Sequence, residues 1–299
     1  MDPELEAFLP FLPDVDLRDP AAARRVLAER AAAIPPPDLS HLDVEDLTVP
    51  ADPGVPVRIY RPREGRGGAI VWLHGGGGVF GDLDTEHPWA GRLAEGSGAT
   101  VISVGYRLAP EHPFPAAQDD AYAVLAWAAG HAAELGLDPD RIAVGGHSAG
   151  GGIAAAVALR ARDEKGPAIR FQLLNQPGLD DRQETWSARN FTDTPWFDSH
   201  KVSLAWRHVL RGRPATAYTA PARATDLSGL PPAYVATAEL CPNRDEDIAY
   251  ALRLMQAGVS VELHQWPGTF HGSQALLSAE ISQRQNAELC AALRRGLAD

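Results

Sequence analysis

The sequence predicts an α/β fold in which a mostly parallel central sheet carries helices on both faces, with a small helical cap at the N-terminus. The first observation is an alternation: from Val55 onward, short β-branched runs are followed by Ala- and Leu-rich stretches. Strands that alternate with helices form βαβ units, which build parallel sheets. The second observation is size, because 299 residues, 45% of them hydrophobic and 22% charged, can bury a large core.

Seven runs have the length and composition of strands. They are Val57–Arg61, Ala69–Leu73, Thr100–Tyr106, Arg141–Gly145, Arg170–Asn175, Ala233–Ala238 and Val259–Gln265. Helices are expected at Ala116–His131, Ala149–Asp163, Asp245–Gln256 and Gln274–Arg295. Only a short link joins the first two strands, so we expect them to pair antiparallel at one edge of the sheet.

Two segments differ from this alternating pattern. Residues 1–50 are expected to form a helical cap segment, because Ala21–Ala33 favours a helix and Phe8 and Phe11 are too apolar to leave in water. The main domain then covers residues 51–299, with a cap insertion at about 182–213. The insertion is rich in aromatic residues, which are expected either to wall an apolar pocket or to belong to the ordinary core.

Charge and cysteine content limit the partners and the compartment. The chain has 27 Lys and Arg against 39 Asp and Glu, a net charge of −12, so we expect no nucleic-acid partner. The uncharged stretch from Ile142 to Leu159 contains five glycines, which argues against a membrane span. Two cysteines cannot form a disulfide framework, and the first residues lack the features of a secretory signal, so we expect a cytoplasmic protein.

The strongest functional signal is the segment Gly146-His147-Ser148-Ala149-Gly150 between a predicted strand and a predicted helix. This is the context of the G-x-S-x-G motif, in which a nucleophilic serine lies on a sharp turn between near-side-chain-free neighbours. The helix that follows points its N-terminus toward the serine, where it helps to stabilise a developing anion. We therefore expect Ser148 to be a nucleophile.

The run His74-Gly75-Gly76-Gly77-Gly78 follows the strand Ala69–Leu73 and predicts an oxyanion hole. Four successive glycines cost chain entropy unless the backbone must approach another group closely. The N–H groups of Gly76, Gly77 and Ala149 could converge on one oxygen. A phosphate-binding loop is the competing interpretation, but the run lacks the Lys and Ser/Thr of a P-loop.

Taken together, these motifs resemble the hormone-sensitive lipase family of α/β-hydrolases, which includes bacterial esterases. The matching pieces are HGGGGVFGDLDTEH at 74–87, YRLAPEHPFPAAQDD at 106–120, GGHSAGGG at 145–152 and PGTFHG at 267–272. The resemblance implies an α/β-hydrolase fold, an ester hydrolase with a Ser–acid–His triad and an N-terminal cap. It also implies acyl chains of short to medium length, no cofactor and a possible homodimer through the last sheet edge.

His271 is the candidate general base. It lies on a loop after the last predicted strand, where the chain order Ser, acid, His places the base, and it also matches the catalytic histidine of the family. No two histidines have metal-ligand spacing on one helix face, so we expect no metal site.

The acid is where the resemblance fails. The family reads Asp-Pro-Leu-Arg-Asp-Glu after the strand Ala233–Ala238, with the first Asp as the acid, but this chain has Cys241 there. A thiol is a poor anion at neutral pH. Another carboxylate is expected to act instead: Asp245 in the same loop or first helical turn, with Glu239 and Asp180 as alternatives.

These observations predict a serine carboxylesterase that acts on small-molecule esters through an acyl-enzyme. Two alternatives stay open. The change at Cys241 favours a catalytically weakened small-molecule binding protein on the same scaffold. The same triad would also serve a hydrolase of amides or lactones.

Overall fold

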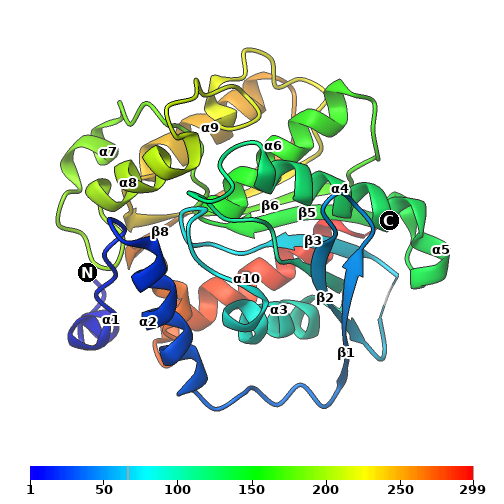
Figure 1. Ribbon diagram of the computed structural model, residues 1–299, viewed down its shortest axis with the longest axis horizontal. Coiled ribbons are helices and arrows are strands. Elements are labelled where there is room, and N and C mark those ends of the chain that lie inside the picture. The colour runs from blue at the N-terminus through cyan, green and yellow to red at the C-terminus, as the bar shows by residue number, and fades with distance from the viewer. Residues whose placement is uncertain (66, 299) are drawn as a thin grey trace.

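The computed structural model describes residues 1–65 and 67–298, and within them eight strands form a single sheet (Figure 1). The strands are β1 (Leu42–Val49), β2 (Val55–Pro62), β3 (Ala69–Leu73), β4 (Thr100–Val104), β5 (Ile142–His147), β6 (Phe171–Asn175), β7 (Ala233–Leu240) and β8 (Val261–Phe270). Their order across the sheet is β1-β2-β4-β3-β5-β6-β7-β8. The pairs β1–β2 and β2–β4 are antiparallel and all the others are parallel.

Helices cover both faces of the sheet, as the alternation of elements predicts. The α-helices are α1 (Pro3–Glu6), α2 (Pro20–Ala32), α3 (Leu83–Ser97), α4 (Ala116–Gly130), α5 (Ala132–Leu135), α6 (Ala149–Asp163), α7 (Trp186–Asn190), α8 (Ser199–Leu210), α9 (Arg244–Gln256) and α10 (Glu280–Gly296). One core contains side chains of α4, α6 and α9, and the core on the opposite face contains side chains of α3 and α10. The sheet is therefore buried on both sides, which suits parallel strands.

Three details of the predicted organisation are wrong. The cap does not extend to residue 50, because Leu42–Val49 form β1 and pair with β2 along their whole length. The strands β2 and β3 do not pair with each other, because β4 lies between them. The last helix begins at Glu280 rather than Gln274, since a 3₁₀ turn at Ser273–Ala275 and a loop precede it.

The N-terminal segment packs on the insertion and not only on the main domain. Val15 and Leu17 share a buried cluster with Phe197 and Val202 of the insertion. Arg24 of α2 donates hydrogen bonds to the carbonyl oxygens of Val79 and Ala109, at 2.7 and 2.8 Å. In Figure 1, α2 and α8 accordingly lie on the same side of the molecule, at the left of the view. No helix in the described ranges is long and apolar enough to span a membrane.

Candidate active site

Ser148 lies on a sharp turn between β5 and α6. Its backbone has φ 55° and ψ −124°, a conformation that costs energy for a residue with a side chain. Neighbouring glycines make the turn possible: a Cβ atom on Gly146 or Gly150 would lie 2.4 or 2.0 Å from the carbonyl oxygen of Leu73. The sequence Gly-x-Ser-x-Gly folds in this way because only glycine fits beside the end of β3.

His271 directly follows β8 and faces Ser148. Its Nε2 atom lies 2.9 Å from the Ser148 hydroxyl oxygen, although 123 residues separate the two in the chain. The imidazole is 5% exposed, and the ring of Phe197 lies 5.5 Å from it. Burial, together with the charge of nearby His147, lowers the pKa of His271 to about 4. The imidazole is thus neutral at pH 7, as a general base must be.

Cys241 contacts the other nitrogen of the His271 imidazole, Nδ1. Its Sγ atom lies 3.0 Å from His271 Nδ1 and is fully buried at the end of β7. Burial raises the pKa of the Cys241 thiol well above its usual range, and the nearby Asp247 carboxyl adds to this effect. The sulfur is therefore a neutral thiol in the position where a triad acid would stand.

The structure does not bring Asp245, the expected acid, to His271. Its carboxylate accepts hydrogen bonds from the Ser187 backbone N–H and the Arg244 side chain, both at 2.8 Å. Asp245 is the second residue of α9, so its side chain leaves the loop in the direction of α7 rather than β8. The prediction of Asp245 as the partner of His271 is therefore wrong.

The two alternative carboxylates are also engaged elsewhere. Glu239 accepts a hydrogen bond from the Gly268 backbone N–H, and Asp180 pairs with Arg182 at 2.8 Å. Among the residues that the structure describes, the hydrogen bonds of His271 go to Ser148 and Cys241. Cys241 itself thus occupies the acid position after β7, and none of the three candidate carboxylates contacts His271.

The glycine run after β3 forms a loop beside Ser148. Gly76 and Gly77 have φ of 110° and 63°, and a Cβ atom on Gly76 would lie 2.2 Å from the Phe80 carbonyl oxygen. Gly77 and Ala149 line a cavity that reaches Ser148, while Gly76 lines a cleft on its other side. The three residues predicted for the oxyanion hole thus line the two spaces that Ser148 also lines.

His74 helps to hold the glycine loop in place. It is buried, stacks on Tyr106 with ring centroids 4.1 Å apart, and its carbonyl oxygen accepts a 2.8 Å hydrogen bond from the Tyr106 hydroxyl. Its Nδ1 atom contacts the Gly75 carbonyl oxygen at 2.7 Å. A loop held in this way keeps its amide groups oriented before a substrate arrives, which is what stabilisation of an oxyanion requires.

Sequence reasoning missed one pair of residues at the site, Glu86 and His147. Glu86 of α3 is buried, accepts a 2.6 Å hydrogen bond from Trp72 and lies 3.3 Å from His147 Nε2. Although burial opposes its charge, His147 and Trp72 hold the pKa of Glu86 below its usual range. The signal that could have found this pair is the place of Glu86 in the first turn of the helix that follows the glycine loop.

Two spaces of different size meet at Ser148. A small cavity of about 70 Å³ lies between α6 and the insertion, with Phe114, Ile153, Val202 and Trp206 among its lining residues. A larger cleft of about 450 Å³ opens toward the cap and is lined by His271, Trp89 and Leu27. Phe197, like Ser148, lines both spaces. The aromatic insertion therefore does wall the site, although Trp186 is 60% exposed and has no part in it.

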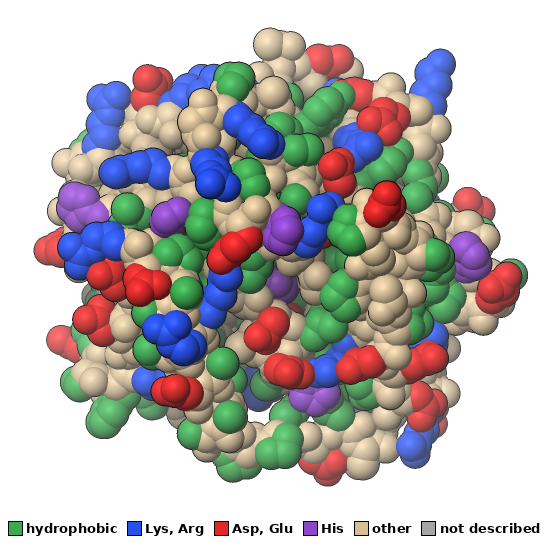
Figure 2. All heavy atoms as spheres, viewed as in Figure 1, with side chains coloured by type: hydrophobic (Ala, Val, Ile, Leu, Met, Phe, Trp, Pro, Cys, Tyr) green, Lys and Arg blue, Asp and Glu red, His purple; other side chains and the backbone are tan. Residues whose placement is uncertain are grey.

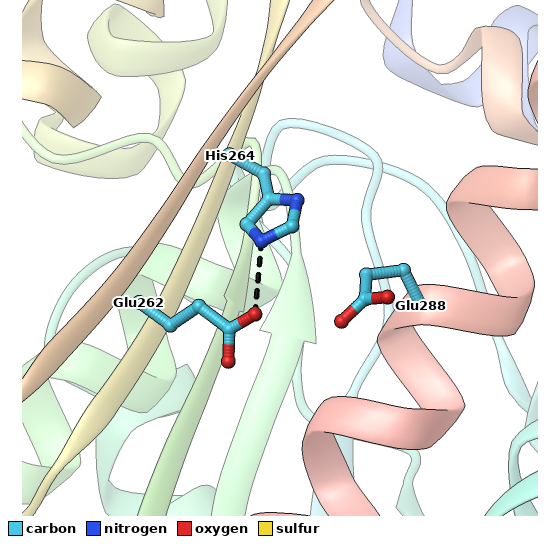
Figure 3. Close-up of side chains that lie close together, drawn as sticks. All are labelled: Glu262, His264 and Glu288. Carbon is cyan, nitrogen blue, oxygen red and sulfur yellow. Dashed lines mark hydrogen bonds and ion pairs between the residues drawn. The ribbon is translucent and has the colours of Figure 1, made fainter.

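The described part of the chain contains one group of side chains with metal-ligand chemistry, which Figure 3 shows. Glu262 and His264 of β8 face Glu288 of α10, and their ligand atoms lie within 4.8 Å of one another. Arg295 already pairs with both carboxylates, at 2.8 Å to Glu262 and 2.7 Å to Glu288. None of these residues is among those that line the cavity or the cleft. The group is therefore explained as an ion-pair network on the outside of the last strand.

Comparison with known proteins places this geometry in a family. Residues 70–275 match the family model that describes the α/β-hydrolase fold. The chain belongs to the hormone-sensitive lipase type of α/β-hydrolase. The predicted fold and family of this hydrolase are therefore confirmed.

Relatives of the hydrolase carry esterase names. Carboxylesterase NlhH of Mycobacterium tuberculosis is 45% identical over 255 residues, which are 81% of this chain and 79% of that protein. The ethyl acetate hydrolase of Pseudomonas putida is 35% identical over 266 residues, 83% and 81% of the two chains. The solved structure of a bacterial heroin esterase superposes with a TM-score of 0.94 at 44% identity, covering 100% of this chain and 98% of the other. The predicted class of enzyme, carboxylic ester hydrolase, is thus the class of these relatives.

Proposed function

We propose that this hydrolase is a serine carboxylesterase that cleaves esters of short to medium acyl chains through an acyl-enzyme. The observation that carries the proposal is the 2.9 Å contact between Ser148 Oγ and His271 Nε2 beside the glycine loop. A serine hydroxyl is a weak nucleophile unless an adjacent base can take its proton. The relatives named carboxylesterase NlhH and ethyl acetate hydrolase support the same reaction.

The reaction follows from the placement of these groups. Ser148 Oγ attacks the ester carbonyl carbon while His271 Nε2 takes the hydroxyl proton. The carbonyl oxygen becomes an anion that accepts hydrogen bonds from the N–H groups of Gly76, Gly77 and Ala149. His271 then gives its proton to the leaving alcohol. Water repeats the sequence on the acyl-enzyme and releases the acid.

Cys241 limits how fast this cycle can run. With the Ser148 hydroxyl donating to Nε2, His271 carries its remaining proton on Nδ1 and donates it to the Cys241 sulfur. This contact holds the ring in the orientation that catalysis needs. A neutral thiol does not stabilise the imidazolium that forms, and loss of a triad carboxylate costs ~10⁴ in kcat in a well-studied protease. We therefore expect real but slow turnover.

The experiment is labelling with a fluorophosphonate combined with hydrolysis of p-nitrophenyl acetate. The native chain is expected to be labelled on Ser148 and to hydrolyse the ester, and Ser148→Ala is expected to do neither. Hydrolysis by Ser148→Ala at the native rate would overturn the proposal. Peptide mapping of the labelled chain distinguishes Ser148 from other hydroxyl groups.

A second candidate is a small-molecule binding protein, which the thiol at position 241 favours. The same experiment separates the two. A binding protein would hold p-nitrophenyl acetate or its products without turnover, even with enzyme in excess. Amide and lactone hydrolysis is tested by offering p-nitroacetanilide and a γ-lactone to the labelled and unlabelled chain.

The cellular context is also part of the proposal. A reducing compartment such as the cytoplasm is supported by two free cysteines, Cys241 and Cys290. Small ester molecules are the proposed partners. Figure 2 shows basic side chains concentrated in the upper left of the view and acidic and basic side chains interspersed over the rest of that face. A homodimer through the edge strand β8 stays a prediction that the molecular mass in solution would test.

A further inference from the structure

The two spaces that meet at Ser148 receive different halves of an ester. Once the carbonyl carbon bonds to Ser148 Oγ and its oxygen enters the glycine loop, the acyl chain and the alcohol point in opposite directions. The small cavity contains Gly77 and Ala149 at its inner end, and the larger cleft contains Gly76. One space must therefore hold the acyl chain and the other must hold the alcohol.

The position of His271 indicates which space holds the alcohol and which holds the acyl chain. The leaving alcohol oxygen takes its proton from His271 Nε2, so the alcohol must lie on the side of that imidazole. His271 lines the larger cleft, together with Phe270 and Gly272 that flank it in the chain. It is not among the described residues that line the small cavity. The alcohol thus belongs in the cleft and the acyl chain in the cavity.

The volumes set the sizes of the two halves. An apolar cavity of ~150 Å³ is large enough for benzene, which has six carbon atoms. The acyl cavity of about 70 Å³ is less than half as large, so it holds a chain of about two to four carbons. The alcohol cleft of about 450 Å³ has three times the volume of that benzene site and accommodates a fused-ring alcohol.

The walls of the cleft suit an apolar alcohol with aromatic character. Trp89 of α3 and Trp196 of the insertion line it, and Leu12, Leu27 and Ile34 of the N-terminal segment close it on the cap side. Ile34 is 60% exposed without a ligand, so a bulky alcohol would bury apolar surface that now faces water. Burial of this apolar surface by the alcohol adds to the affinity of the hydrolase for the substrate.

We propose that the substrates are esters that combine a short acyl group, acetyl to butyryl, with a bulky apolar alcohol. The inference rests on the proposed function, because it assigns the two halves by the role of His271. It also narrows that function: of two esters with the same atoms, the one that carries its bulk on the alcohol is the substrate.

Two isomeric esters test the assignment directly. 1-Naphthylmethyl acetate and methyl 1-naphthylacetate have the same formula and unactivated primary alcohols as leaving groups, but the ring lies on the alcohol in the first and on the acid in the second. We expect kcat/KM to be at least 100-fold higher for 1-naphthylmethyl acetate. Equal values, or a preference for the methyl ester, would overturn the inference. Cleavage of p-nitrophenyl acetate without cleavage of either naphthyl ester would also overturn it.

Failure of the proposed function gives a different result. In that case none of the three esters is cleaved and a fluorophosphonate does not label Ser148. Labelling of Ser148 therefore separates a wrong assignment of the two spaces from a wrong reaction. Single-turnover measurement with enzyme in excess keeps slow cleavage detectable.

Variants in the acyl cavity supply an independent test. Trp206→Ala and the milder Val209→Ala both enlarge this cavity from α8. Each is expected to raise the ratio of kcat/KM for 1-naphthylmethyl hexanoate over the acetate by 10-fold or more. The matched control Leu27→Ala enlarges the cleft instead and is expected to leave this ratio unchanged. If Leu27→Ala raises the ratio and folded Val209→Ala does not, the acyl chain lies in the cleft and the inference is wrong.

Discussion

Cys241 determines how strong a base His271 can be. The thiol lies 3.0 Å from Nδ1, within reach to orient the ring, but it stays neutral because burial raises its pKa. Nothing at this position then offsets the cost of placing a positive imidazolium in a buried site. The side chain acts through His271 and is a positioning residue.

Restoring a carboxylate at position 241 should therefore accelerate the reaction. We expect Cys241→Asp to raise kcat for p-nitrophenyl acetate by ~10²- to 10⁴-fold, because an anion next to Nδ1 stabilises the imidazolium. The matched control is Cys241→Ser, which keeps the size and the neutral charge and should bring no such gain. Equal rates for Asp and Ser at position 241 would show that charge at this position does not limit the cycle.

The pH profile gives a second reading of the same residue. The base must be neutral, and the pKa of His271 is lowered to about 4, so kcat/KM should hold as pH falls and decline only near pH 4. In the Cys241→Asp variant, the decline on the acid side should begin at a higher pH than in the native chain, because the new anion raises the pKa of the imidazole. Initial rates between pH 3.5 and 8 measure both limbs; a native midpoint near 6.5 would contradict this account of the burial of His271.

Individual residues of the site differ in how well the sequence predicts them. Ser148 and the glycines around it are predictable because the whole Gly-x-Ser-x-Gly pattern lies within residues 146 to 150, between a strand and a helix. The partner of His271 depends on how β7 and β8 place residues 241 and 271 side by side, which no local pattern contains. Asp245 was expected on chemical grounds, but its backbone position in α9 directs it toward Ser187 and Arg244.

At the scale of elements, the turn between β5 and α6 depends on glycines that admit no side chain. Gly150→Ala should lower the free energy of unfolding by several kcal/mol and abolish fluorophosphonate labelling, because its Cβ would lie 2.0 Å from the Leu73 carbonyl oxygen. The matched control is Gly130→Ala at the end of α4, where nothing lies within 4 Å of the added Cβ. That change should be neutral or stabilising by ~0.5 kcal/mol. Urea unfolding curves check both, and a native-like Gly150→Ala would refute the steric argument.

Elements were predictable where one physical signal dominates. β3 and α6 have the predicted bounds because β3 is wholly buried and uncharged and α6 is a long run of small apolar residues. β1 escaped prediction because it is an edge strand with four exposed central residues, Asp43 to Asp46, that hide its alternation. α3 contains Pro88, which argues against a helix locally, and tertiary packing against α10 and β4 overrides that preference.

At the scale of the whole molecule, an acidic chain has buried several carboxyl groups. Glu246 is 3% exposed and accepts hydrogen bonds from the backbone N–H groups of Leu179 and Asp180. Burial raises its pKa to about 8, and the neighbouring Asp180 adds to the effect. Because the folded pKa lies above the unfolded value of 4.5, the stability that Glu246 contributes is complete below about pH 4.5 and is lost as pH rises to about 8.

Glu246→Gln should remove this pH dependence. The amide oxygen can still accept both backbone hydrogen bonds and never becomes charged. We expect the variant to gain stability over the native chain as pH rises from 5 to 9, on the order of a few kcal/mol at the upper end. The control is Glu134→Gln, at a position that is exposed. Urea unfolding at several pH values measures the difference, and a constant difference for Glu246→Gln would contradict a raised pKa.

The contacts of Arg24 connect the cap with the chemistry. A single guanidinium from α2 holds the carbonyl oxygens of Val79 and Ala109, and Ala109 in turn donates its N–H to the carbonyl oxygen of Gly78. A displacement of α2 would therefore break these bonds and loosen the backbone next to the oxyanion amides. The N-terminal segment thus supports the amides that receive the substrate oxygen, and its detachment is expected to weaken catalysis as well as to uncover the cleft.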